Sequence, residues 1–393
     1  MLFVNHIKKW SFLFFVTHSQ SVYSALPSQD FPITGHIAQQ SDFWEKIFTQ
    51  LPSTSSLIHD MNHPNVLLDL IDHHKIAKQK NRKLPSLAQQ ASLTEAYLNR
   101  YKEALNHFKI YGEKAKHKSL IEMRVYEVYK RQRKMSSLLK GRAKIRSQAG
   151  LSDQFILGGS RSQNYLHQME DIFREYNVPE VITRLSFVES MFNNQARSKV
   201  GASGVWQFMK PTAKNFIIVD KFIDERNSPL KATRAAAQLL SENYKLLGTW
   251  PLAITAYNHG PTGLRKAVKK FRTKDLNTII SQYKSSTFGY ASRNFYSEFV
   301  AAARSYQKYI NQGLITKPDA EKKFYEIKPH KRRTIPNTLK AFNISWSTFR
   351  SWNPGMTQQG YRYYQNNLLP KKYKIIVPAS SLHSAKKHNF QRR

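Results

Sequence analysis

The stretch from residue 179 to residue 190 is Pro-Glu-Val-Ile-Thr-Arg-Leu-Ser-Phe-Val-Glu-Ser, and it decides what fold and chemistry the sequence predicts. Proline is favoured in the first turn of a helix, so we expect a helix to begin at Pro179. The apolar residues follow helical spacing and form one stripe, made of Val181, Ile182, Leu185, Val188 and Phe192. Glu189 lies four residues after Leu185 and three before Phe192, which places its carboxyl group on the apolar face.

A carboxyl group on an apolar face loses hydration, which raises its pKa and keeps it protonated near neutral pH. A protonated carboxyl in an apolar cleft is what a general acid requires. The alternative is a structural glutamate at the edge of the stripe, which reaches water or pairs with Arg184 or Arg197. The helix alone leaves both interpretations open.

The sequence that follows favours the catalytic interpretation. From Ser190 to Val219 there is no Asp or Glu, and the middle of this stretch is Gly201-Ala-Ser-Gly-Val-Trp-Gln207. Glycines let the backbone adopt positive φ or approach a ligand closely. Trp206 and Gln207 add an aromatic face and an amide, which are common carbohydrate-binding groups. Further on, Ala253-Ile-Thr-Ala-Tyr-Asn-His-Gly260 predicts a helix that ends at a glycine cap, with Tyr257 and Asn258 in its last turn.

Taken together, these motifs resemble the catalytic domain of lytic transglycosylases of the soluble-lytic-transglycosylase (SLT) type, nearest the D branch of the membrane-bound enzymes. The resemblance covers residues 178–310. It rests on Glu189-Ser190, on the glycine motif that ends at Gln207, and on Ala256-Tyr257-Asn258. A further family motif, typically acidic-Thr-Arg-x-Tyr, is matched only loosely by Ala291-Ser-Arg-Asn-Phe295. Motifs in the family's order are a more specific signal than any one of them.

The resemblance implies a lysozyme-like catalytic domain that cleaves peptidoglycan between N-acetylmuramic acid and N-acetylglucosamine. Glu189 would act first as acid and then as base, the substrate's acetamido group would stabilise the cation, and a 1,6-anhydro ring would form without water. The implied substrate-binding residues are Ser198, Gly204, Gln207, Met209, Tyr257 and Asn258. The resemblance implies neither a cofactor nor a metal, and we expect the scattered His59, His63, His73 and His74 not to form a metal site.

Two alternatives stay close to this prediction. A goose-type lysozyme-like muramidase would hydrolyse the same bond, but it would need a second carboxylate about 5–10 Å from the first. The acid-free stretch contains no such carboxylate, so a hydrolase would need the fold to place Asp220, Asp224 or Glu225 near Glu189. The other alternative is a non-catalytic wall-binding scaffold, against which the presence of Glu189 and Gln207 argues.

The composition indicates an anionic partner. The chain of 393 residues has 62 Lys and Arg against 26 Asp and Glu, a formal net charge of +36. This excess draws a protein to polyanions, whether nucleic acid, anionic membrane or anionic envelope polymers. The basic residues match no known nucleic-acid-binding motif. We therefore expect peptidoglycan strands and anionic envelope polymers as partners, and not nucleic acid.

The N-terminus predicts secretion. Lys8 and Lys9 precede a short apolar run from Trp10 to Val16, and small residues follow up to Ala25. We interpret residues 1–25 as a signal peptide, expect the mature chain in the periplasm or cell envelope, and find no other stretch apolar enough to span a bilayer. Without cysteine, the chain can carry no lipid anchor on a cysteine and no disulfide.

The sequence predicts a mainly α protein in several parts. Residues 26–41 resemble a linker, and helices follow up to residue 150, which completes an N-terminal helical region. The catalytic domain is predicted over residues 151–315. Residues 322–379 are predicted to form a separate small α+β module with strands at Phe324–Ile327 and Tyr373–Val377, similar to a LysM domain, a glycan-binding fold. A disordered basic tail is expected over residues 380–393.

Overall fold

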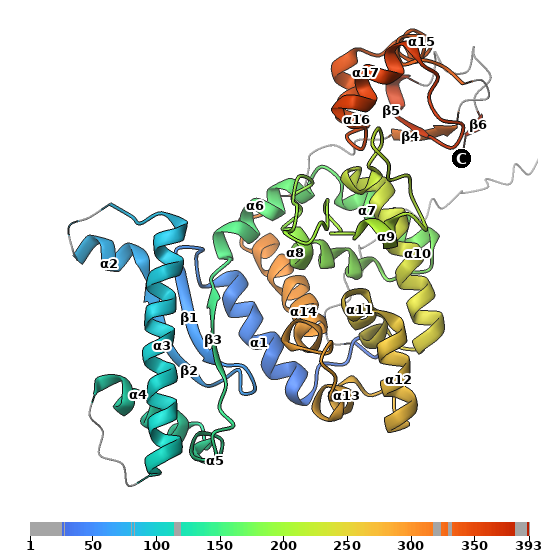
Figure 1. Cartoon of the computed structure of the whole chain (residues 1–393). Coiled ribbons are helices and arrows are strands. Elements are labelled where there is room, and N and C mark those ends of the chain that lie inside the picture. Colours follow the sequence, from blue (N-terminus) through green and yellow to red (C-terminus); the bar gives the residue numbers. More distant parts are fainter. Residues whose placement is uncertain are drawn as a thin grey trace, which may run out of the picture.

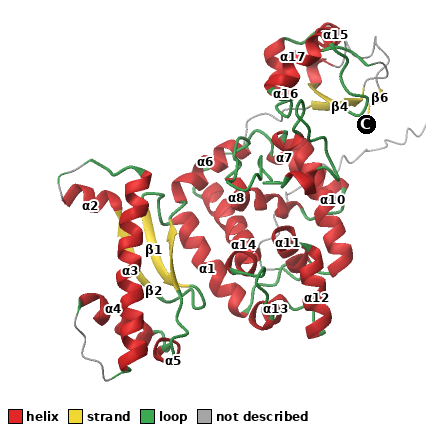
Figure 2. Ribbon diagram, viewed as in Figure 1, coloured by secondary structure: helices red, strands yellow, loops and turns green. Residues whose placement is uncertain are grey.

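The computed structural model describes residues 26–392, apart from 27, 80, 82, 114–118, 317–323, 329–331 and 382–390. The predicted signal peptide and most of the basic tail lie outside the described residues. The chain is mainly helical, as predicted, and two small sheets lie at opposite ends of the molecule (Figures 1 and 2). No helix among the described residues is both long and apolar enough to cross a membrane.

The first helix, α1 (Gly35–Thr49), is not part of a linker but belongs to the main helical core, which we call the catalytic core after the activity that the sequence predicts for it. It packs along the last helix of that core, α14 (Tyr290–Asn311), and is buried there through Ile37, Phe43, Trp44, Ile47 and Phe48. The prediction of a linker over residues 26–41 is therefore wrong at its C-terminal end, because the polar composition there hides apolar residues at helical spacing.

Between α1 and the rest of the core, residues 52–149 form an insertion with a hydrophobic core of its own. Its centre is an antiparallel sheet in the order β2-β1-β3. The strands are β1 (Ser55–Asp60), β2 (Leu67–Asp72) and β3 (Ile145–Ala149). The helices of the insertion are α2 (His73–Gln79), α3 (Leu87–Tyr111), α4 (Leu120–Arg131) and α5 (Met135–Leu139). The purely helical pattern predicted for this region is therefore wrong.

The sheet lies between α1 and α3, so both of its faces are covered (Figure 1). Every residue of β1 is buried; Leu57 packs into the core shared with α1, and Ile58 packs into the insertion's core. The chain enters and leaves the insertion at one place, because the Leu151 amide donates to Ile47 O at 2.9 Å and the Ser152 amide donates to Leu51 O at 2.9 Å.

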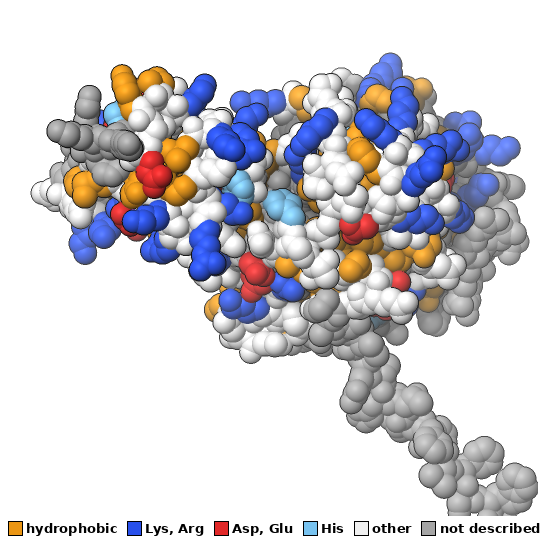
Figure 3. Space-filling view, turned by 90° about the horizontal axis from the view of Figure 1, so that it is seen from below, with side chains coloured by type: hydrophobic (Ala, Val, Ile, Leu, Met, Phe, Trp, Pro, Cys, Tyr) orange, Lys and Arg blue, Asp and Glu red, His pale blue; other side chains and the backbone are white. Residues whose placement is uncertain are grey.

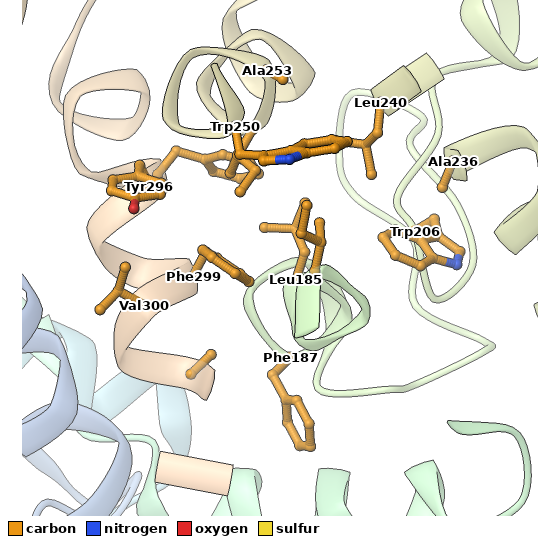
Figure 4. Close-up of a cluster of buried hydrophobic side chains, with 14 of the residues drawn as sticks. Leu185, Phe187, Trp206, Ala236, Leu240, Trp250, Ala253, Tyr296, Phe299 and Val300 are labelled. Atoms are coloured by element: carbon orange, nitrogen blue, oxygen red, sulfur yellow. The ribbon is translucent and has the colours of Figure 1, made fainter. Parts of the chain in front are cut away.

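The catalytic core then closes around a short central helix, α8 (Leu185–Ser190). Figure 4 shows Leu185 pointing from α8 towards Trp250, while Phe187 points to the opposite side. The α-helices around it are α6 (Ser152–Ser162), α7 (Leu166–Glu175), α9 (Lys210–Ala213), α10 (Pro229–Leu247), α11 (Trp250–His259), α12 (Pro261–Phe271), α13 (Leu276–Gln282) and α14. Two 3-10 turns, Glu180–Arg184 and Glu225–Asn227, complete the core.

The predicted helix from Pro179 differs from the structure at both ends. Its first turn is the 3-10 segment Glu180–Arg184, and α8 ends at Ser190. Met191 and Phe192 follow with φ of 50° and 54°, a left-handed conformation that cannot continue an α-helix. Phe192 is therefore buried from a turn and not from the helical stripe.

The C-terminal module has the predicted β-strand pair around helices. β4 (Phe324–Lys328) pairs antiparallel with β5 (Ile375–Pro378). Between them in the sequence lie α15 (Ile335–Phe342), α16 (Trp346–Trp352) and α17 (Gln358–Asn366). A short 3-10 turn, Ala379–Ser381, follows β5. A last strand, β6 (Gln391–Arg392), pairs with β4, so the expectation of a disordered tail fails for these two residues.

The module is not separate from the catalytic core, contrary to expectation. A loop of the core, residues 219–224, which we call the docking loop, inserts into the module and buries Ile223 completely in its hydrophobic cluster. The Asp224 amide donates to Gly355 O at 2.7 Å, and the Phe222 ring stacks on Tyr363 at 4.3 Å between centroids. The two parts thus share hydrophobic core and backbone hydrogen bonds.

Candidate active site

Glu189 lies one residue before the end of α8, at a pocket of about 320 Å³. Burial raises the pKa of its carboxyl group from 4.5 to about 8, and the nearby charge of Glu298 contributes in the same direction. The side chain is half-buried and keeps contact with the pocket, although protein atoms surround most of it. Glu189 is therefore a largely protonated acid at neutral pH that faces an open cavity.

The ion pairs of Glu189 with Arg184 or Arg197, considered as the structural alternative, are not observed. Arg184 pairs with Glu170 and lies over the ring of Tyr306, and Arg197 is exposed. Among the described residues, no cation forms an ion pair with Glu189.

The pocket brings together most of the residues that the sequence predicted. It is lined by Ser198, Gln207, Met209, Tyr257 and Asn258 together with Glu189. Further lining comes from Val200, Ala202, Phe208, Thr212 and Leu239. These residues come from the loop after α8, from α9 and α10, and from the end of α11, so the pocket exists only in the folded domain.

The end of α8 is held by hydrogen bonds to the loop of residues 201–207, which we call the glycine loop. The Ser190 hydroxyl donates to Val205 O at 2.9 Å, and the Gln207 side-chain amide donates to Gly204 O at 2.8 Å and to Ala196 O at 3.1 Å. Gln207 itself has φ of 45°, a third left-handed non-glycine residue close to Glu189, after Met191 and Phe192. Such conformations persist only where the surrounding structure enforces them, and they cluster at functional sites.

Two of the residues that the sequence singled out do not line the pocket. Gly204 does not line the pocket: it has φ of 80°, and a Cβ there would lie 1.9 Å from Arg226 O, so this glycine serves close backbone packing. Trp206 offers no face to a sugar because it is completely buried; its Nε1 donates to Thr233 Oγ1 at 2.9 Å, and its ring stacks on Phe173.

Tyr257 closes one side of the pocket. Its hydroxyl donates to Trp206 O at 2.8 Å, and its ring lies parallel to that of Phe295 at 6.4 Å between centroids. Burial, followed by the charge of Glu189, raises the pKa of Tyr257 well above its usual value, so the phenol stays neutral. Next to it, Asn258 Oδ1 accepts a hydrogen bond from the Ser292 hydroxyl at 2.9 Å.

The three acids considered as a second carboxylate serve other purposes. Asp224 forms an ion pair with Arg226 at 2.8 Å, whose guanidinium also donates to Gly201 O and Phe208 O and so supports the glycine loop. Glu225 pairs with Lys231 at 2.6 Å, and Asp220 accepts backbone hydrogen bonds within the docking loop. None of the three lines the pocket.

The sequence interpretation missed a different carboxyl group, Glu298 on α14. Burial raises the pKa of Glu298 to about 8, while the charge of Arg146 on β3 opposes this rise. The signal in the sequence was the one that identified Glu189, an acid on an apolar helix stripe, because Glu298 follows Phe295 by one turn. Within the described residues, no three His, Asp or Glu side chains gather as metal ligands.

Residues 170–280 match the family model of the transglycosylase SLT domain. This range contains Glu189 and every residue that lines its pocket, so the family match covers the whole candidate site. The chain is 28% identical over 120 residues to the membrane-bound lytic murein transglycosylase D of Escherichia coli (strain K12), which is 30% of this chain and 26% of that protein. The chain thus spans about a quarter of the length of that relative.

A second relative is the putative tributyltin chloride resistance protein of Alteromonas sp. (strain M-1), 30% identical over 129 residues, which are 32% of this chain and 62% of that protein. Among solved structures, the lytic transglycosylase Slt of Pseudomonas aeruginosa, an inactive mutant, has a TM-score of 0.33 and 19% identity, covering 58% of this chain and 36% of that one. The 70 kDa soluble lytic transglycosylase of Escherichia coli has a TM-score of 0.32 and 15% identity, covering 71% and 52%.

Proposed function

We propose that this protein is a peptidoglycan lytic transglycosylase that cleaves the bond between N-acetylmuramic acid and N-acetylglucosamine. The observation that carries the proposal is Glu189, a desolvated carboxyl group at a pocket within an SLT domain. The relationship to lytic murein transglycosylase D supports the same substrate. The neutral form of this carboxyl group supplies the proton that a glycosidic oxygen needs when the bond breaks.

The reaction uses one residue twice. Glu189 donates its proton to the glycosidic oxygen, and the substrate's own acetamido group stabilises the cation that forms. The ionised Glu189 then takes the proton of the muramyl 6-hydroxyl, whose oxygen closes the 1,6-anhydro ring. Ser198, Gln207, Met209, Tyr257 and Asn258 line the same pocket and are the proposed sugar contacts. The proposed site of action is the peptidoglycan of the periplasm or cell envelope.

Hydrolysis of the same bond is the second candidate, because Glu298 supplies a carboxyl group whose charge reaches Glu189. An inverting or retaining hydrolase uses such a pair, whereas a lytic transglycosylase does not need it. The two candidates give different products from the same bond.

Digestion of purified sacculi, followed by mass analysis of the muropeptide ends, tests the proposal. We expect 1,6-anhydro ends, which are lighter than reducing ends by one water. Reducing ends alone would identify a hydrolase, and an absence of released muropeptides would support a non-catalytic scaffold.

A further inference from the structure

A second pocket lies where the catalytic core meets the C-terminal module. It has a volume of about 420 Å³, and we call it the junction pocket. The core supplies residues of α10, the segment 214–218 that follows α9, and Tyr176 at the end of α7. The module supplies Glu326 of β4 and two lysines, Lys372 and Lys374, that precede β5. Because both parts form its walls, the pocket is complete only while the module is docked.

The lining of the junction pocket is rich in cations. Its basic side chains come from the core and from the module, and they are Lys214, Lys231, Arg234, Lys372 and Lys374. Two carboxylates, Glu225 and Glu326, lie among them. Glu225 pairs with Lys231 at 2.6 Å, and Glu326 lies 3.2 Å from Arg234 and 3.6 Å from Lys374. Both carboxylates of the pocket are therefore already paired.

Two exposed lysines remain for a ligand, one from each part of the molecule. Within the described ranges, neither Lys214 nor Lys372 has a carboxylate at ion-pair distance. An anion that enters between the core and the module therefore meets two cations that are not yet neutralised, and hydrogen bonds to charged groups are the strong ones.

The core fixes the backbone beside Lys372. Buried Lys231 donates to Lys374 O at 2.6 Å, and its ammonium group lies 3.9 Å from the centre of the Tyr373 ring. Tyr373 stands between Lys372 and Lys374 in the sequence and is almost completely buried. The backbone that carries Lys372 is thus ordered before a ligand arrives, which lowers the entropy cost of binding.

One face of α10 runs along both pockets. Lys231, Ala235 and Gln238 follow helical spacing and line the junction pocket. Leu239, four residues after Ala235, lines the Glu189 pocket. With a rise of about 1.5 Å per residue, Lys231 and Leu239 lie ~12 Å apart along the helix.

The segment around α9 also connects the two pockets. Thr212 of α9 lines the Glu189 pocket, and Lys214, two residues further on, lines the junction pocket. Lys214 is exposed, so a ligand can pass over this segment from one pocket to the other.

The proposed substrate carries an anion of suitable reach, because each muramic acid of peptidoglycan can bear a short peptide with free carboxylates. An extended peptide of about four residues spans at most ~14 Å, close to the ~12 Å of the shared helix face. The amide side chains of Asn215 and Gln238 offer further partners for peptide N–H and C=O groups. A phosphate polymer has no N–H groups for such partners, and Glu225 and Glu326 would repel it. The lining therefore favours a peptide.

We propose that the junction pocket binds the carboxylate end of a peptide whose muramic acid lies in the Glu189 pocket. Lys214 and Lys372 contact the carboxylate, so the docked module takes part in selecting strands that bear peptides. The inference rests on the proposed function, since its ligand belongs to the proposed substrate.

Calorimetric titration of the folded full chain with two soluble probes tests the inference without catalysis. The probes are N-acetylglucosaminyl-N-acetylmuramic acid with a tetrapeptide and the same disaccharide without a peptide, and neither contains the bond that the enzyme is proposed to cut. The peptide-bearing probe should bind more tightly. Lys214→Gln and Lys372→Gln should each reduce the ratio of the two dissociation constants by up to about fivefold, the size of a solvent-exposed ion pair. Lys371→Gln removes a neighbouring exposed lysine that does not line the pocket, and it should keep the wild-type ratio.

Equal binding of the two probes to the wild type, or a ratio that both lysine variants leave unchanged, would overturn the inference. Inorganic polyphosphate is the probe for the other kind of anion. If the wild type binds it, the lysine variants lose it and the two disaccharides bind equally, the pocket belongs to a phosphate polymer and the inference is wrong. If the disaccharide ratios behave as expected but the wild type releases no muropeptides from sacculi, the peptide site holds and the proposed function fails.

Discussion

Glu189→Gln separates a chemical role of this residue from a structural one. The change is nearly isosteric, and it removes the proton donor at the pocket. General acid catalysis is worth about 10²–10⁴-fold, and one residue here serves as acid and base, so we expect muropeptide release to fall by at least that range. Glu242→Gln, which changes an exposed glutamate of α10, is the matched control and should retain full activity. Release at a near-native rate from folded Glu189→Gln would remove this residue from the mechanism.

The raised pKa of Glu189 also predicts how stability depends on pH. In the unfolded chain this carboxyl group ionises near its ordinary value of 4.5, whereas in the folded protein it keeps its proton up to about 8. The unfolded state thus binds fewer protons between these values, and the contribution of Glu189 to the free energy of unfolding falls as pH rises through this window. Chemical denaturation across the window should show a shallower decline in Glu189→Gln than in the wild type. At neutral pH the variant should be at least as stable, and a loss of stability there would point to a structural glutamate.

The sequence predicted the central acid but not its partner. Glu189 could be identified because a glutamate on an apolar stripe was followed by an acid-free, glycine-containing motif. Glu298 carries the first of these signals, but its significance depends on the packing of α14 against α8 and on Arg146, which comes from a strand far away in the sequence. Trp206 was misjudged for a related reason, because only the fold buries it against Phe173.

At the scale of elements, the glycine loop offers a paired test. Gly204 and Gly201 both have positive φ, but a Cβ at Gly204 would lie 1.9 Å from Arg226 O, whereas a Cβ at Gly201 meets nothing within 4 Å. Gly201→Ala should lower the free energy of unfolding by about 1–2 kcal/mol, the strain of a non-glycine residue in a left-handed conformation. Gly204→Ala should lower the free energy of unfolding by clearly more than that. It should also reduce activity, because the added Cβ displaces the loop that positions Ser190 and Gln207. Denaturant melts and muropeptide release measure both, and equal effects of the two substitutions would contradict this account.

The sequence predicted helices that bury one face only, because their apolar residues follow the helical period. It did not predict the strands of the insertion. α11 ends at His259 and is capped by Gly260 with φ of 92°, as predicted. β1 shows no alternation of apolar and polar residues because both of its faces are covered, and some of its polar residues contact partners far away in the sequence. Asp60, for example, accepts from the Tyr129 hydroxyl at 2.7 Å, and the centre of the His59 ring lies 4.3 Å from that of Phe43, with the two rings tilted by 36°. The spacing of apolar residues along the chain does not reveal such partners.

At the scale of the whole molecule, the docking loop should make the catalytic core and the C-terminal module unfold together. Ile223 comes from the core but is completely buried in the module, and truncation of such a side chain costs about 2–5 kcal/mol. We expect one calorimetric transition for these two parts in the wild type and two in Ile223→Ala. Leu368→Ala, which changes an exposed residue of the module, is the control and should keep one transition. Two transitions in the wild type would show that the module folds independently.

The net charge of +36 predicts that wall binding depends on salt. Figure 3 shows Lys and Arg side chains spread over one face of the molecule, and not gathered in a single patch. Attraction to anionic envelope polymers should weaken as the Debye length falls from ~10 Å at 0.1 M salt to ~3 Å at 1 M. Sedimentation with sacculi at increasing salt measures this. Binding that does not change with salt would point to specific sugar contacts, for which the C-terminal module, predicted from the sequence to resemble a LysM domain, is the candidate.

The packing of α1 on α14 has a consequence for the order in which the chain folds during synthesis. Ile37 and its partners on α14 are separated by about 260 residues, as in the Ser297 hydroxyl that donates to Ile37 O. α1 therefore emerges long before the helix that buries it. The insertion has its own hydrophobic core, whose buried residues all lie between Ile58 and Ile145, and it can form in the meantime. Its two ends meet where the Leu151 amide donates to Ile47 O. We expect a nascent chain that ends before α14 to hold a folded insertion beside an unfinished core, and the core to assemble only when its last helix has been synthesised.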